Sequence, residues 1–197
     1  MTEADEEVVR SVLAPYEAKL FQAVHGAWED WKGLGLGGRL LFPGRTRACL
    51  VHDFMVQRAI AAFTADRAVR TIRRDETAKF VFADQVALRF KKADDNGLGS
   101  NIETEATLDF VEQQQELPGI PNVHKIEVVY ILNKLRTQIE RVVVVARDRD
   151  MRLWSYVIAP ATAAEIVSLP VVKPQPERGA RIKIRGWDKD QKKETGE

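Results

Sequence analysis

The feature that most constrains the fold is an alternation in residues 85–92, QVALRFKK, where apolar side chains occupy every second position from Val86 to Phe90. Successive side chains of a strand point to opposite faces, so this pattern predicts a β-strand with one apolar face. The other face carries Arg89 and Lys91. We therefore expect a sheet with a cationic face, which is the first candidate for a binding surface.

Two helical segments are predicted before this strand. Apolar residues recur at three- and four-residue steps over residues 6–31, and Pro15 either kinks this helix or lies in the first turn of a helix that begins there. The glycine-rich segment 33–44 follows neither the helical nor the strand periodicity and is expected to be a loop. A second helix is predicted over residues 45–64, with Met55 at the centre of its apolar face.

Short alternating runs predict two groups of three strands, joined by a short acidic helix over residues 104–114. The expected strands are residues 69–73, 78–82, 85–91, 125–132, 139–147 and 152–158. Residues 142–145 are apolar on both faces and are expected to lie in the interior of the sheet. The predicted fold is α+β: two N-terminal helices packed on a mostly antiparallel sheet, in the order α-α-β-β-β-α-β-β-β.

Residues 1–160 are expected to form a single α+β domain, and residues 161–197 an irregular, extended or partly disordered tail. Within the tail, residues 180–187 (ARIKIRGW) alternate isoleucine with basic residues. This pattern suits either a strand added to the edge of a sheet or a simple spacer.

Composition places the chain among ordinary globular proteins, with 45% hydrophobic residues in 197. The only cysteine, Cys49, excludes an internal disulfide and a cysteine-based zinc site, and its apolar neighbours predict an inert thiol. The acidic start of the chain is unlike a secretory signal, and no run approaches the length of a membrane span. We expect a cytoplasmic protein that does not associate with membranes.

Charge is segregated along the chain although the net charge is only +1. Residues 45–92 hold eleven basic and five acidic residues, whereas residues 93–122 hold seven acidic residues and no basic one. Two interpretations follow: the acidic segment neutralises the basic strand internally, through Glu105, Asp109 and Glu112, or the separated charges orient an encounter with a charged partner.

Motifs with a fixed chemical meaning are absent from the sequence. The GLGLGG run follows a helix instead of a strand, which favours a connector over a phosphate-binding loop. His25, His52 and His124 lack metal-ligand spacing, and no serine lies in a Gly-x-Ser-x-Gly elbow. Trp154 and Tyr156 alternate with arginine in a manner that suits base stacking, but a place in the core is favoured.

The predicted order of helix, three-strand meander, helix and strand resembles the core of the PD-(D/E)xK nuclease-like superfamily. In that family one strand carries an acidic residue and the next carries Glu-x-Lys. The corresponding triplet is Arg89-Phe90-Lys91, so the lysine matches and an arginine replaces the acid. The resemblance implies a magnesium-dependent nuclease or a decayed relative, with Asp75, Asp84 and Lys91 in the active-site roles. An RFKK…N…T…F run is also loosely similar to small uncharacterised bacterial proteins.

The function favoured by the sequence is a non-enzymatic binding or accessory module that needs no cofactor and presents a basic sheet face. The expected contacts are Arg89, Lys91, Lys92, Arg73 and Arg74. Such cations contact either an acidic protein surface or a nucleic-acid backbone, and the net charge near zero favours a protein partner. A non-catalytic nucleic-acid-binding protein is therefore the third hypothesis, beside the nuclease.

Overall fold

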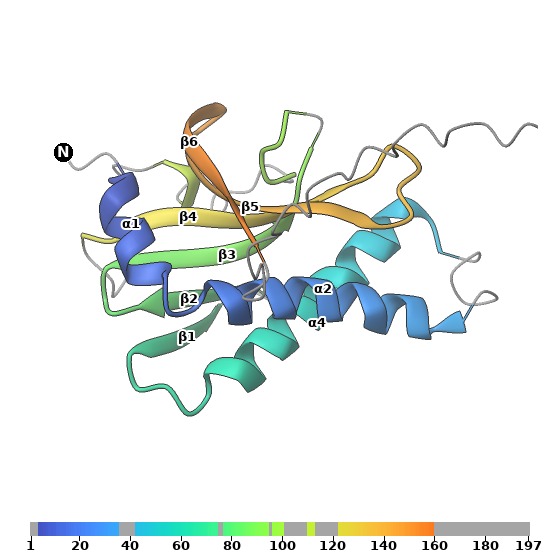
Figure 1. The fold of residues 1–197 in the computed structure, drawn as a ribbon, viewed down its shortest axis with the longest axis horizontal. Helices are drawn as coiled ribbons and strands as arrows, with labels where there is room; N and C mark the ends of the chain where they lie inside the picture. The colour runs from blue at the N-terminus through green and yellow to red at the C-terminus, as the bar shows by residue number, and fades with distance from the viewer. Residues whose placement is uncertain are drawn as a thin grey trace, which may run out of the picture. The chain divides into compact units, whose positions relative to one another are not determined.

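In the computed structural model of the protein, the alternating segments form one six-stranded sheet in the order β1-β2-β3-β4-β5-β6 (Figure 1). The structure describes residues 4–35, 42–74, 77–94, 96–100, 110–112 and 122–159. The strands are β1 (Val69–Arg74), β2 (Thr77–Phe82), β3 (Val86–Lys92), β4 (His124–Leu132), β5 (Ile139–Asp148) and β6 (Met151–Ile158). The predicted α+β fold with its mostly antiparallel sheet is confirmed.

The sheet consists of two antiparallel meanders joined by one parallel pair. The strands β1, β2 and β3 form the first meander, and β4, β5 and β6 form the second. Between the meanders, β3 and β4 run parallel, with Leu88 opposite Ile126. A parallel pair needs a crossover connection, because a tight hairpin reverses the chain direction.

Three helices precede the sheet in the described part of the chain: α1 (Glu6–Leu13), α2 (Glu17–Gly33) and α4 (Gly44–Phe63). The helical signal over residues 6–31 forms two helices instead of one kinked helix, and Pro15 lies in the turn between them and not in the first turn of α2. The chain turns at residues 14–16, because Pro15 has no N–H for helical bonding and its ring clashes with the preceding turn. The side chain of Asp5 caps α1 by accepting hydrogen bonds from the N–H groups of Glu7 at 2.9 Å and Val8 at 3.3 Å.

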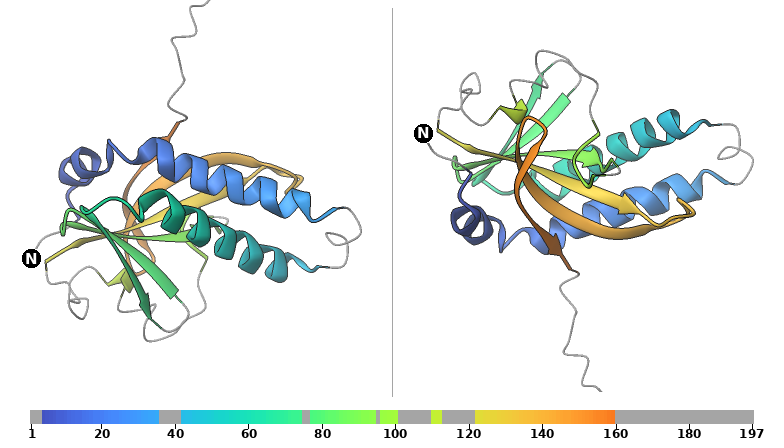
Figure 2. Two further views of the ribbon diagram at one scale, coloured as in Figure 1. Left: turned by 90° about the horizontal axis from the view of Figure 1, so that it is seen from below. Right: turned by 90° about the horizontal axis from the view of Figure 1, so that it is seen from above.

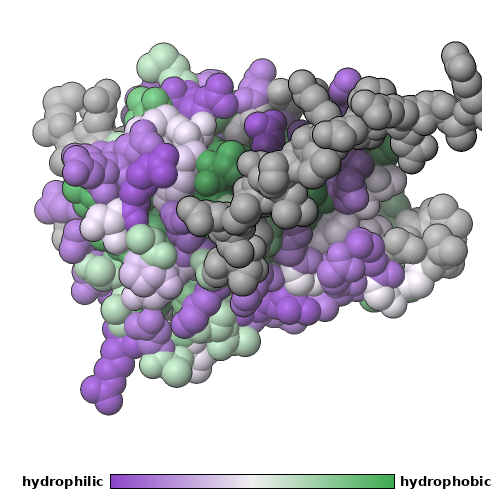
Figure 3. Space-filling model, viewed as in Figure 1, coloured by the Kyte–Doolittle hydropathy of each residue, from purple (hydrophilic) through white to green (hydrophobic). Residues whose placement is uncertain are grey.

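Helices α2 and α4 lie side by side across one face of the sheet (Figure 2). The predicted apolar positions of β3, Val86, Leu88 and Phe90, are completely buried on this face. Aromatic side chains fill the space between the layers, with Phe63 of α4 edge-on to Phe82 at 5.3 Å between ring centroids. The side of α2 turned away from the sheet is mainly hydrophilic (Figure 3).

Residues 142–145 are buried on both faces of β5, which lies between β4 and β6 as predicted for an interior strand. On the face away from α2 and α4, the short segments 93–100 and 110–112 pack against the sheet. They contribute Ala93, Leu98 and Phe110 to two smaller hydrophobic clusters. The sheet is therefore covered on both sides.

Some predictions fall outside the described residues. The acidic helix over 104–114 is described only at 110–112, where Phe110 and Val111 are helical. The tail, residues 161–197, lies wholly outside. None of the described helices combines the length and apolar character that crossing a bilayer would require.

Candidate anion-binding site on the cationic sheet face

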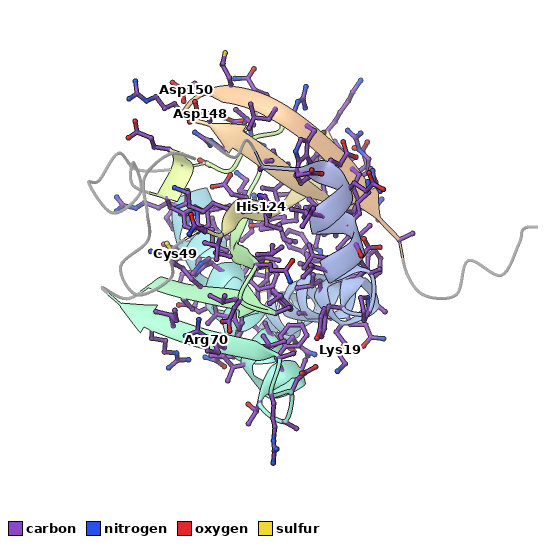
Figure 4. The ribbon with its side chains drawn as sticks, turned by 90° about the vertical axis from the view of Figure 1, so that its left-hand side faces the viewer. Lys19, Cys49, Arg70, His124, Asp148 and Asp150 are labelled. Atoms are coloured by element: carbon purple, nitrogen blue, oxygen red, sulfur yellow. The ribbon has the colours of Figure 1, made fainter. Side chains whose placement is uncertain are left out.

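The face of the sheet away from α2 and α4 carries a concentration of positive charge, and we call it the cationic face. Strand register places on it Arg70, Lys79, Arg89, Lys91, Lys125 and Arg147. Glu127 is a buried carboxylate on this face. Figure 4 shows how far the sheet extends, with Arg70 on β1 and Asp150 near β6 on opposite sides of His124.

Arg89 and Glu127 form a buried ion pair at the centre of the cationic face. The Nη2 of Arg89 lies 2.6 Å from Oε1 of Glu127, and its Nε donates to the same oxygen at 3.0 Å. Arg89 is 7% exposed and Glu127 is 1% exposed. Internal neutralisation, one of the two interpretations of the charge pattern, therefore applies to Arg89, with Glu127 as its partner. The predicted acidic partners Glu105 and Asp109 lie outside the described residues.

The second oxygen of Glu127 holds the segment 93–100 against the sheet. The N–H of Gly99 donates to Oε2 of Glu127 at 3.1 Å, and the Nη1 of Arg147 lies 3.7 Å from the same oxygen. The Nη1 of Arg147 also donates to the carbonyl of Gly99 at 3.1 Å. One carboxylate thus links β3, β4, β5 and a loop, which is the kind of pairing that a buried charge needs.

The segment 110–112 covers the neighbouring part of the cationic face. The guanidinium carbon of Arg89 lies 4.3 Å from the ring centroid of Phe110, and the Nζ of Lys79 lies 5.6 Å from it. The Nζ of Lys125 donates to the carbonyl of Glu112. The carboxylate of Glu112 pairs with Arg149 at 2.8 Å, so this predicted acidic residue neutralises a cation other than Arg89.

Lys91 is half-buried at the end of β3, two residues from Arg89. Burial is the largest cause that lowers the pKa of its ammonium group, and the positive charges of Arg89 and Arg147 lower it further, whereas Glu127 raises it. Burial likewise lowers the pKa of Arg89. A negative group placed beside Lys91 would offset both the desolvation and the repulsion.

His52 of α4 lies within electrostatic range of the same cations. Burial is the main cause that lowers the pKa of its imidazole; Lys91 and Arg89 add to this effect, and Asp53 opposes it. The Nδ1 of His52 lies 3.4 Å from a carboxylate oxygen of Asp53, the adjacent residue. His52 is half-buried.

The remaining predicted contacts are dispersed. Lys92 is half-buried at the end of β3, and Arg73 is exposed on β1. Arg74 is the last residue of β1, although its side chain lies outside the described part of the structure. The predicted group of five cations therefore does not form one exposed row.

Asp84 and Lys91, the two described residues that the nuclease hypothesis requires, do not converge. Asp84 is exposed in the turn before β3, where it pairs with Arg70 at 2.6 Å. Lys91 lies at the other end of β3, and the five steps from Val86 to Lys91 alone span roughly 16 Å at about 3.3 Å per residue. Asp75 lies outside the described residues. Across the described ranges, no three His, Cys, Asp or Glu side chains gather to hold a metal.

Sequence reasoning missed Glu127, Lys125 and Arg147. The signal was present in β4, where Lys125 and Glu127 alternate with isoleucine and valine in an otherwise apolar strand. Such an alternation puts both charges on one face of a strand whose other face is core. The alternation alone does not show that the segments 93–100 and 110–112 cover this charged face.

Two further predictions about single residues can be compared with the structure. Cys49 is exposed near the start of α4, and the inertness of its thiol stays a prediction. Trp154 is partly buried and Tyr156 is 7% exposed, both within the main core. Their predicted place in the core is confirmed.

Comparison with known proteins adds no relative: neither a protein-family model, nor a curated protein, nor a solved structure matches the chain.

Proposed function

We propose that this protein is a non-enzymatic binding module that docks an acidic surface of a partner protein at the half-buried end of the cationic face, with Lys91 as a direct contact. The observation that carries the proposal is the half-buried position of Lys91 on β3, two residues from Arg89, where burial and then the charges of Arg89 and Arg147 lower the pKa of its ammonium group. A carboxylate from a partner lowers the electrostatic energy of such a cluster.

Within this proposal, the predicted contacts have different roles. Lys91 reaches the partner directly, whereas Arg73 lies on the other face of β1 and is not a contact in this proposal. Arg89 is a positioning residue, because its guanidinium is engaged by Glu127 and lies over the ring of Phe110. Burial is the main cause that lowers the pKa of Lys91, and the positive charge of Arg89 lowers it further.

Binding of fluorescent poly-L-glutamate to the full chain tests the proposal. We expect Lys91→Gln to weaken binding about fivefold, which corresponds to roughly 1 kcal/mol for one charge-assisted contact. Lys19→Gln is the matched control, because Lys19 is an exposed lysine on α2, away from the cationic face. Equal affinity of the two variants, or no binding by the wild type, would reject the proposal.

A nucleic-acid backbone is the second candidate partner, and the arginines along the sheet edge favour it. Arg67, Arg70 and Arg73 are all exposed on or just before β1. If this candidate is correct, a DNA duplex binds more tightly than poly-L-glutamate and its affinity falls linearly with salt on logarithmic axes. Arg67→Gln combined with Arg73→Gln then reduces the salt slope by about 2.

The metal-dependent nuclease remains the third candidate, on the order of its helices and strands. It requires magnesium-dependent cleavage of DNA or RNA that Asp84→Ala abolishes. Because Asp84 pairs with Arg70, Arg70→Gln serves as a control for loss of that ion pair alone. Absence of cleavage by the wild type with magnesium or manganese would remove this candidate.

A further inference from the structure

A second surface lies where α2 ends, α4 begins and β4 turns into β5. Five large hydrophobic side chains are exposed in the described part of the chain, and three of them belong to these segments. Leu34 is 43% exposed, Phe42 is 41% exposed and Leu135 is 80% exposed. We call Leu34, Phe42 and Leu135 the apolar end. Isolated surface leucines are ordinary, but three from separate segments at one end of the fold require an explanation.

Two contacts and the ribbon views place the three segments together. The rings of Trp31 in α2 and Phe42 before α4 are 6.2 Å apart. The Nη1 of Arg47 in α4 donates to the carbonyl of Arg136 in the β4–β5 turn at 3.2 Å. In Figures 1 and 2, the end of α2, the start of α4 and this turn lie at the same end of the sheet.

Cations surround the exposed hydrophobic side chains. Residues 42–49 and 133–138 contain Arg45, Arg47, Lys134 and Arg136 and no acidic residue. Leu135, the most exposed of the three, stands between Lys134 and Arg136, which are both exposed. The positive end of the α4 dipole lies in the same region, because α4 begins at Gly44.

The β4–β5 turn has a defined shape that presents Leu135 outward. The side chain of Asn133 accepts a hydrogen bond from the N–H of Thr137 at 2.8 Å, and the N–H of Arg136 donates to the carbonyl of Asn133 at 2.8 Å. Arg136 has a left-handed backbone with φ of 54°. Leu135 therefore projects from a fixed turn as a convex tip.

We propose that the apolar end is a peripheral docking surface for an anionic lipid bilayer. Leu34, Phe42 and Leu135 enter the boundary between headgroups and acyl chains, while the flanking lysine and arginines lie at the level of the anionic headgroups. A convex tip ringed by cations complements a soft, negatively charged surface better than a rigid protein pocket. Such docking needs no membrane-spanning helix.

The test is co-sedimentation of the full chain with phosphatidylcholine vesicles, with and without phosphatidylglycerol. We expect binding only to the anionic vesicles. Each neutralised cation weakens it about fivefold, so Lys134→Gln combined with Arg136→Asn weakens it about 25-fold. Asparagine is chosen because it tolerates the left-handed backbone at position 136. Leu135→Ser weakens binding as well, without loss of thermal stability, because its side chain contributes little to the core.

Two matched variants serve as controls. Met151→Ser removes a hydrophobic side chain that is 67% exposed at the opposite end of β5, and Lys19→Gln removes a cation on α2. Both should bind anionic vesicles like the wild type. Failure of the wild type to sediment with anionic vesicles overturns the proposal. Binding that persists in Leu135→Ser but is lost in Lys91→Gln also overturns it, because the cationic face would then be the contact.

Discussion

Arg89 of β3 and Glu127 of β4 stand opposite each other in the one parallel pair of the sheet, with Nη2 and Oε1 2.6 Å apart and both side chains buried. Buried ion pairs seldom stabilise more than a hydrophobic replacement would, but removal of one partner leaves the other charge without compensation. Arg147 shares the carboxylate of Glu127, so the loss of Glu127 affects two buried arginines.

We expect Glu127→Gln to lower the free energy of unfolding by about 3–5 kcal/mol, because two buried guanidinium groups lose their shared countercharge. Urea unfolding followed by circular dichroism measures the change. The control is Glu140→Gln, because Glu140 is half exposed and lies 3.8 Å from Arg141. That substitution should change stability by less than about 1 kcal/mol. Similar losses in both variants would contradict a central role for Glu127.

Gly99→Ala tests the close approach of the loop to the buried pair. A Cβ at position 99 would collide with the carboxylate of Glu127. Because that carboxylate is fixed by Arg89 and Arg147, we expect a loss of about 1–3 kcal/mol, as for other overpacked sites. Gly44→Ala is the control, since a Cβ there meets no atom within 4 Å. A neutral Gly99→Ala would show that the loop moves away at no cost.

The ion pair between Asp30 of α2 and Arg58 of α4 should contribute modestly to helix packing. Two hydrogen bonds of 2.6 Å join the side chains, and hydrogen bonding from Arg58 is the main cause that lowers the pKa of Asp30. Both side chains remain more than one third exposed, so solvent screens the pair. We expect Asp30→Asn to cost about 0.5–1 kcal/mol at low salt and less at high salt, measured by thermal unfolding.

Stability should fall in mild acid because of His52 and His25. Burial is the main cause that lowers the pKa of both below the ordinary value of 6.5, so the unfolded chain binds protons more readily than the folded one. By linkage, the stability is complete above pH 6.5 and is lost as pH falls through the lower pKa of the folded state. Urea unfolding across this range should show a shallower loss for His52→Gln than for the wild type. Identical slopes would contradict burial of His52 as a cause.

The strands were predictable because each carries its own periodic signal. The alternation of Val86, Leu88 and Phe90 directs these side chains to the core whatever the neighbouring strand is. The break between α1 and α2 was less predictable. The apolar periodicity continues through Pro15, and sequence alone does not decide whether proline kinks a helix or ends it.

The candidate site was predictable only in part, because burial of a charged strand face depends on distant residues. The alternation correctly put Arg89 and Lys91 on the face opposite the core. Burial of Arg89 results from Glu127, thirty-eight residues along the chain, and from the ring of Phe110. No local period encodes such a contact, because it arises from the parallel pairing of β3 with β4.

The parallel pairing of β3 with β4 has a consequence for the order of folding. Each meander forms through contacts between strands that are adjacent in sequence. The strands β3 and β4 are instead separated by residues 93–123. The pairing of β3 with β4 should form late in folding, because closing the long loop between them costs conformational entropy before any contact compensates it. Substitutions at Glu127 should then accelerate unfolding and barely slow refolding, which a chevron plot would reveal.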